Sequence, residues 1–214
     1  MREAPQRTVS AIIPAAGSGK RYGGKKQFVL IDGIPVLKIT LNALRNAYPF
    51  NEYIIGIADE DRAFIEALDL GSDVIFSPGG PNRAATVINA LKRSKCDFVA
   101  VHDAVRPFVS AETVKKCVYK AFSDGAAICG LFAVDTVKLV KDAGVVSTVE
   151  RDAVFLAHTP QVFEREKLLK ALNFAVESGQ TITDEASAYE FAGYSVSITL
   201  SDKKNIKITY SEDI

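Results

Sequence analysis

The sequence predicts an α/β fold, in which a mainly parallel sheet is covered by helices on both faces. Strand-like apolar runs alternate with helical patterns along most of the chain, and this alternation is typical of βαβ units. Polar segments rich in glycine or charge follow the first, third and fourth predicted strands. Ligands of such folds bind beyond the carboxyl ends of the strands, so we expect these segments to meet at one edge of the sheet.

The first five predicted strands are apolar runs, and four helical patterns lie between them. Ser110 is the expected N-cap of the fourth helix, with Glu112 in its first turn. The strands are expected at Val9–Pro14, Tyr53–Ala58, Val74–Ser77, Phe98–His102 and Ala126–Ala133, and the helices at Leu37–Ala47, Arg62–Leu68, Arg83–Ser94 and Ala111–Phe122.

From Val134 the pattern changes to short alternating segments around Asp142-Ala143-Gly144, which predicts a β-hairpin. An isolated hairpin is only marginally stable in water, so we expect this arm (residues 134–154) to pack against a second copy of the protein. The whole chain, residues 1–214, is interpreted as one domain that carries the arm. The remaining expected elements are strands at Pro160–Phe163 and Ser195–Leu200, a helix at Glu164–Glu177 that ends before Gly179, and a helix at Asp184–Ala192 capped by Thr183.

Composition and charge narrow the class of protein. The 26 basic and 26 acidic residues balance, so no global field favours nucleic acid or an anionic membrane as a partner. The polar N-terminal stretch and the lack of an apolar run of membrane-spanning length predict a cytoplasmic protein. Cys96, Cys117 and Cys129 are interpreted as buried thiols in a reducing compartment rather than as disulfides or zinc ligands.

The segment Ala11–Phe28, AIIPAAGSGKRYGGKKQF, joins the first strand to a loop rich in glycine and cations. It is not a Walker A loop, because Pro14 stands where the first glycine is needed and Arg21 where a hydroxyl is needed. It is not a dinucleotide fingerprint, because Tyr22 replaces the third glycine. Backbone N–H groups and added cations suit several phosphates, although a solvated turn would explain the same residues. The cations are Lys20, Arg21, Lys25 and Lys26.

Asp103 follows the fourth strand, where a carboxylate can hold a hard divalent cation together with nucleotide phosphates. The alternative is that Asp103 caps its own loop or pairs with Arg106. His102 has no second histidine at metal-ligand spacing, so we expect it to serve packing or hydrogen bonding.

The second glycine loop, PGGPNRAAT at residues 78–86, places Arg83 and Thr86 in the first turn of a helix, where N–H groups favour anions. A plain turn would explain the loop equally well. The motifs of serine hydrolases, zinc proteases and dithiol enzymes are missing from the sequence. Cations outnumber candidate nucleophiles, which indicates phosphoryl or nucleotidyl transfer, because the substrate then supplies the nucleophile.

Seven motifs occur in an order and spacing that resembles the 2-C-methyl-D-erythritol 4-phosphate cytidylyltransferases of the non-mevalonate isoprenoid pathway. They are PAAGSGKRYGGKKQF, HDAVRP, VDTVK, TVERD, HTPQVF, TITDEASAYEFAG and NIKIT, and the resemblance extends from about Val9 to the C-terminus. It implies a Rossmann-like nucleotidyltransferase fold, a three-layer sandwich with a protruding β-arm, and a homodimer whose arms interlock. The implied reaction joins CTP to methylerythritol phosphate and releases pyrophosphate, with Mg²⁺ or another divalent cation as cofactor.

The resemblance also implies roles for individual residues. The catalytic cations would be Arg21, Lys26 and Lys207. CTP would contact Pro14, Ala15, Ala16, Gly17, Gly19, Gly80, Arg83, Thr86, Asp103 and Ala104, and Asp103 would also bind the metal. Methylerythritol phosphate would contact Arg106, Thr136, Arg151, Thr159, Thr183 and Asp184, of which Thr136 and Arg151 lie on the arm and would serve the partner subunit's site.

One departure concerns the second glycine loop, which reads Pro81-Asn82 before Arg83 where many relatives carry an acidic pair. Backbone groups can still recognise cytosine there. Two rival interpretations remain. One is a cytidylyltransferase for a pentitol phosphate such as ribitol 5-phosphate, and the other is a non-catalytic nucleotide-binding regulatory module. The joint presence of Lys26, Asp103 and Lys207 favours catalysis.

Overall fold

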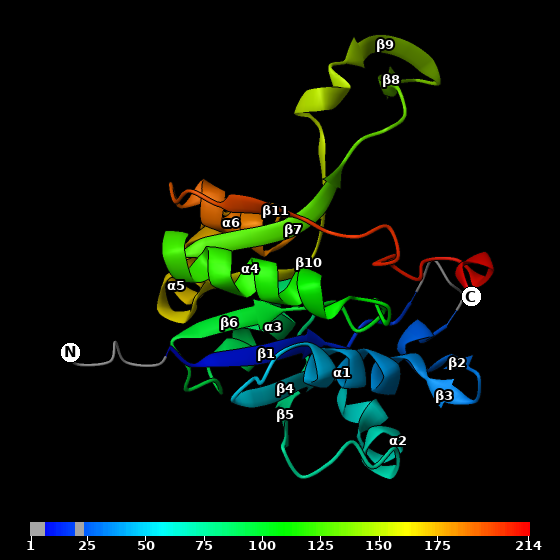
Figure 1. Cartoon of the computed structure of the whole chain (residues 1–214), viewed down its shortest axis with the longest axis vertical. Coiled ribbons are helices and arrows are strands. Elements are labelled where there is room, and N and C mark those ends of the chain that lie inside the picture. Colours follow the sequence, from blue (N-terminus) through cyan, green and yellow to red (C-terminus); the bar gives the residue numbers. More distant parts are fainter. Residues whose placement is uncertain (1–6, 20–23) are drawn as a thin grey trace.

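A computed structural model describes residues 7–19 and 24–214. The central sheet contains β1 (Val9–Pro14), β4 (Glu52–Ile57), β5 (Val74–Pro78), β6 (Phe98–Val101), β7 (Ala126–Phe132), β10 (Phe155–Glu164) and β11 (Ser197–Leu200). Its order is β11-β7-β10-β6-β1-β4-β5 (Figure 1). Neighbouring strands are parallel except around β10, which runs antiparallel to both β6 and β7. The expected mainly parallel sheet is therefore confirmed.

Helices cover both faces of this sheet, as expected. They are α1 (Val36–Ala47), α2 (Arg62–Ala67), α3 (Arg83–Leu91), α4 (Ala111–Asp124), α5 (Arg165–Glu177) and α6 (Glu185–Phe191). Alternate residues of a strand point to opposite faces, so Ile13 joins Leu41 of α1 in one core while Ile12 joins Val87 of α3 in the other. Helices α1 and α4 build the first core, and α3, α5 and α6 build the second. No helix in the described part of the chain is long and apolar enough to span a bilayer.

Several short elements were not predicted. They are β2 (Leu30–Ile31) and β3 (Ile34–Pro35), which pair with each other, and the single 3₁₀ turns η1 (Lys26–Phe28), η2 (Asp59–Asp61), η3 (Arg151–Ala153) and η4 (Ser211–Asp213). Segments of two or three residues are too short to show a periodic pattern in sequence.

The ends of the helices follow from local side-chain hydrogen bonds. Ser110 accepts a hydrogen bond from the backbone N–H of Thr113 at 3.2 Å, which confirms it as the N-cap of α4. The predicted cap of α6 was wrong by one residue: Asp184, not Thr183, is the N-cap. The Asp184 carboxylate accepts from the N–H of Ser187 at 2.9 Å, and such a cap is worth about 1 kcal/mol.

The arm is a two-stranded sheet formed by β8 (Val137–Lys141) and β9 (Gly144–Val149). Asp142 and Ala143 have φ values of 49° and 61°, as a tight hairpin turn requires, so the predicted turn is confirmed. Figure 1 shows the arm projecting from the body of the protein on two connecting segments. Val140 and Val145 are 62% and 67% exposed, so apolar side chains of the arm face solvent in the single chain.

Candidate active site

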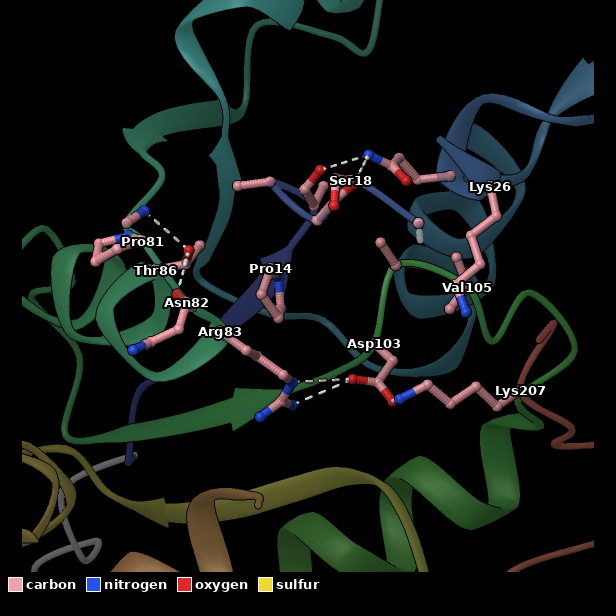
Figure 2. Close-up of a pocket in the computed structure, with 17 residues that line it drawn as sticks. Pro14, Ser18, Lys26, Pro81, Asn82, Arg83, Thr86, Asp103, Val105 and Lys207 are labelled. Atoms are coloured by element: carbon pink, nitrogen blue, oxygen red, sulfur yellow. Dashed lines mark hydrogen bonds and ion pairs between the residues drawn. The ribbon is translucent and has the colours of Figure 1, made fainter. Parts of the chain in front are cut away.

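The carboxyl ends of β1, β5 and β6 surround one cavity of about 600 Å³, shown in Figure 2. Its walls include all ten residues that the resemblance assigned to the nucleotide, together with Lys26 and Lys207. Arg21, the third predicted catalytic cation, lies outside the described residues. The wall residues that sequence reasoning did not assign a role are Ser18, Gln27, Pro81, Asn82 and Val105.

The first glycine loop is held by Gln27, a buried side chain that sequence reasoning missed. Its Nε2 donates to the carbonyl oxygens of Ala15, at 2.9 Å, and Gly17, at 3.0 Å. Gly19 has a φ of 66°, and a Cβ there would lie 1.7 Å from the carbonyl oxygen of Gly24, so only glycine fits. The part of the loop from Ala15 to Gly19 therefore presents backbone to the cavity, as a phosphate cradle needs.

The two neighbouring lysines at the end of this loop point to different partners. Lys26 lines the cavity. Lys25 instead binds Asp61 and, at 2.9 Å, Glu60, both in the 3₁₀ turn η2. Its hydrogen bonds with Asp61 and Glu60 raise the pKa of Lys25. Of the two, Lys26 is thus the one placed to meet a phosphate.

Asp103 lies at the centre of three cationic side chains. Its Oδ1 accepts from Arg83 at 3.2 and 3.3 Å, and its Oδ2 lies 2.9 Å from Lys207 Nζ and 3.5 Å from Arg106 Nε. Figure 2 shows Arg83 and Lys207 reaching the carboxylate from opposite sides. Burial alone would raise the pKa of Asp103, but Arg83, Lys207 and Arg106 outweigh it and hold that pKa well below its ordinary value. The pairing with Arg106 that sequence left open therefore exists, and it is one of three.

The donor set at this position limits how a metal could bind. Asp103 is the one carboxylate among the described residues that line the cavity, and the described chain has no cluster of three or more His, Cys, Asp or Glu side chains suited to a metal. Mg²⁺ commonly takes one or two carboxylates and completes its shell with water and substrate phosphates. The site fits a metal of that kind, shared with a polyphosphate, and does not fit a cage built of protein ligands alone.

The second glycine loop packs closely against the first. A Cβ on Gly79 would lie 2.6 Å from the Cβ of Ala16. The N–H of Gly80 donates to Thr86 Oγ1 at 3.0 Å. Asn82 caps α3, because its Oδ1 accepts from the N–H of Ala85 at 2.9 Å. The Asn82 side chain is thus engaged in holding the start of α3.

Thr159 and His102 form a buried hydrogen-bonded group that holds the backbone of Asp103. The backbone N–H of Asp103 donates to Thr159 Oγ1 at 3.0 Å, and the same oxygen lies 3.1 Å from His102 Nδ1. His102 Nε2 lies 3.1 Å from the carbonyl oxygen of Arg106, which fixes the proton on Nε2. Burial lowers the pKa of His102 to about 4, so the ring is neutral and serves as a hydrogen-bonding residue, as expected.

None of the residues predicted to contact the acceptor lines the cavity in the single chain, namely Arg106, Thr136, Arg151, Thr159, Thr183 and Asp184. Arg106 is buried beside the cavity and donates from Nη1 to the carbonyl oxygen of Asn205 at 2.7 Å. Asp184 is engaged in capping α6. Arg151 lies at the base of the arm and donates to the carbonyl oxygen of Val134 at 3.2 Å. The structure therefore brings together the nucleotide residues. Among the acceptor residues, Arg106 and Thr159 contact Asp103 without lining the cavity, whereas Arg151 lies apart at the base of the arm.

Comparison with known proteins gives one consistent result. Residues 9–214 match the family model of 2-C-methyl-D-erythritol 4-phosphate cytidylyltransferase. Two relatives with that name, from Petrotoga mobilis and Bacillus cereus, are 37% and 39% identical; the matches cover 96% and 95% of this chain and 94% and 93% of the relatives. A crystal structure of 4-diphosphocytidyl-2C-methyl-D-erythritol synthase from Anaerococcus prevotii superposes with a TM-score of 0.86 at 30% identity, over 97% of this chain and 92% of that one.

Proposed function

The chain belongs to the 2-C-methyl-D-erythritol 4-phosphate cytidylyltransferases, and from this membership we propose how its own residues carry the reaction. The enzyme transfers CMP from CTP to methylerythritol phosphate and releases pyrophosphate, giving 4-diphosphocytidyl-2-C-methyl-D-erythritol. One observation supports this reaction in the present chain. The cavity at the carboxyl edge of the sheet is lined by both glycine loops, by Lys26 and by the Asp103–Lys207 ion pair.

CTP binds with its triphosphate on the first glycine loop and its cytidine towards the second. The Ala15 N–H already donates to the carbonyl oxygen of Gly56 at 2.7 Å, so the backbone from Ala16 to Gly19 supplies N–H groups to the phosphates. Gly80 and Thr86 line the part of the cavity that receives the nucleoside. Since Asn82 is occupied by capping α3, the base is recognised mainly through backbone groups.

The chemical step requires no general base, because a phosphate oxygen of the acceptor is already ionised at neutral pH. That oxygen attacks the α-phosphorus of CTP in line, the bond from the α-phosphorus to the bridging oxygen breaks, and pyrophosphate leaves with the electron pair. Charge grows on the equatorial oxygens. Lys26 and Lys207 stabilise this charge inside the cavity, and Arg21 is assigned the same role by its position in the motif.

Mg²⁺, or another divalent cation, is the proposed cofactor. Asp103 would contribute one carboxylate oxygen and the phosphates of CTP would contribute others. When bound, the metal would neutralise phosphate charge and make the pyrophosphate a better leaving group.

The acceptor site is completed by a second subunit. The arm of a homodimer carries Thr136 and Arg151, and its exposed valines gain burial when the partner packs on them. Arg151 of the partner subunit would hold the acceptor's phosphate through its planar guanidinium. The subunit that holds CTP supplies the other acceptor residues, Arg106, Thr159, Thr183 and Asp184.

We also propose a cytoplasmic location, which is supported by the free thiols of the three cysteines.

The decisive test of function is pyrophosphate release with CTP and Mg²⁺, comparing methylerythritol phosphate with ribitol 5-phosphate. Release with methylerythritol phosphate alone is the expected result. A preference for ribitol 5-phosphate would keep the chemistry and change the acceptor. Tight CTP binding with no release from either acceptor would support a regulatory module instead.

A further inference from the structure

Glu185 is a fully buried acid that does not line the cavity, yet it touches a residue that does. It is the first residue of α6, with no exposed surface. Its Oε1 lies 2.6 Å from Arg83 Nη1, while its Oε2 has no hydrogen-bond partner in the described structure. A buried carboxylate is costly unless it is paired, and among the described residues Glu185 pairs with Arg83. This ion pair therefore indicates the role of Glu185.

Arg83 is held from two sides, by Glu185 and by Asp103. Nη1 faces Glu185, whereas Nε and Nη2 face Asp103 Oδ1 at 3.3 and 3.2 Å. Because Arg83 occupies Oδ1, the other oxygen of Asp103 is left to Lys207 at 2.9 Å and Arg106 at 3.5 Å. A continuous chain of ion pairs thus runs from Glu185 through Arg83 and Asp103 to Lys207.

The start of α6 is fixed firmly enough to anchor this chain. Gln161 of β10 donates from Nε2 to Asp184 Oδ2 at 2.8 Å and accepts from the N–H of Ala186 at 3.1 Å. These two bonds flank Glu185 on the helix. Gln161 is itself buried in the central sheet, so the residues on both sides of Glu185 are tied to the sheet.

We propose that Glu185 is a positioning residue for nucleotidyl transfer, which orients Arg83 and, through Arg83 and Asp103, sets the place of Lys207. This inference rests on the proposed function of the same cavity. Without Glu185, Arg83 is free to turn from Asp103 towards the triphosphate, and Asp103 and Lys207 lose their fixed geometry. Small displacements of catalytic groups lower the rate strongly, so the loss falls on kcat more than on substrate binding.

The first measurement does not depend on turnover. In protein labelled with ¹⁵N at arginine, the guanidinium of Arg83, assigned by its loss in Arg83→Met, should give resolved side-chain N–H signals because two carboxylates restrict it. Glu185→Gln should average these signals, whereas Glu190→Gln, a matched change at an exposed position of the same helix, should leave them intact. Unchanged Arg83 signals in Glu185→Gln would overturn the inference, whether or not the protein proves to be a cytidylyltransferase.

The second measurement is kinetic. Glu185→Gln should lower kcat by about tenfold and leave the KM for the acceptor within about twofold of wild type. In the Arg83→Met background, Glu185→Gln should have no further effect on kcat, because the two residues act in series. Additive losses, a raised acceptor KM, or a wild-type kcat would each refute positioning through Arg83. Should Glu185→Gln fold poorly, Glu185→Asp replaces it, since the shorter side chain keeps the charge but loses reach to Arg83.

Discussion

Lys207 Nζ lies 2.9 Å from Asp103 Oδ2 although the two residues come from distant parts of the chain. The Lys207 side chain is 37% exposed and the Asp103 side chain 9%. A nearly buried carboxylate thus holds a lysine at the wall of the cavity. This contact fixes the lysine before any substrate arrives, which lowers the cost of ordering it during the reaction.

Replacing Lys207 by Met should reduce kcat by roughly hundredfold, because one charge contact to the transition state is lost. The fold should be retained, since Asp103 keeps Arg83 and Arg106 as partners. Lys203→Met, at an exposed position in the same segment, is the matched control and should keep the wild-type rate. Pyrophosphate release and thermal unfolding measure the two effects separately; a normal rate in Lys207→Met would remove this lysine from the mechanism.

Lys25 and Lys26 should respond differently to substitution. Lys26→Ala removes a cation from the cavity wall and should cost roughly hundredfold in kcat. Lys25→Ala removes a contact with Asp61 and Glu60 outside the wall, so its effect on kcat should be less than about tenfold. The comparison requires only steady-state pyrophosphate assays on two adjacent variants. Equal losses would mean that the loop rearranges around CTP and uses both cations.

Lys26→Ala and Arg151→Ala should complement each other if the arm serves the partner subunit's site. Each variant alone should be nearly inactive. After unfolding and refolding as a mixture, half of the dimers pair one variant with the other, and one of their two sites has both residues intact, so activity should return to about a quarter of wild type. A mixture that remains inactive, while mass measurement shows mixed dimers, would place Arg151 outside the partner's site.

The three thiols should resist alkylation in the native protein. Burial raises the pKa of Cys96 and of Cys117, and raises that of Cys129 to about 12. At pH 8 the folded protein therefore has at least about a thousandfold less Cys129 thiolate than an unfolded chain, in which the pKa is about 8.5. Since these pKa values are raised by folding, the thiols favour the native state below about pH 8.5 and this contribution is lost at higher pH.

Mass spectrometry after iodoacetamide treatment tests this protection. No adduct is expected on the native protein, and three are expected in urea. A thiol that reacts quickly in native buffer would contradict the buried positions of the cysteines.

Much of the fold could be predicted because its signals are local. The apolar run at Val9–Pro14 becomes β1 with the predicted bounds, and Ser110 caps α4 as expected. The direction of β10 could not be predicted, because the periodicity of a strand is the same in both directions. Its first residues were also missed, since they pair with β7 across an irregularity between Ala157 and Gln161.

In the candidate site, too, the features with a local sequence signal could be predicted and those set by tertiary contacts could not. The glycine loops are continuous in sequence, so their place at the edge of the sheet followed from the alternation of strands and helices. The partners of individual charges did not follow, because they are set by tertiary contacts. Nothing local distinguishes Lys25 from Lys26, or identifies Gln27 as the donor that shapes the loop and Glu185 as the partner of Arg83.

Strand β10 has a consequence for protein engineering. It leaves the arm at Phe155, passes beneath Asp103 at Thr159 and reaches the far end of the sheet at Glu164. The hairpin is therefore not an interchangeable module. A chimaera that takes its arm from a relative should carry the whole of β10 with it, because a junction within this strand would join the new hairpin to a Thr159 that still has to support the backbone of Asp103.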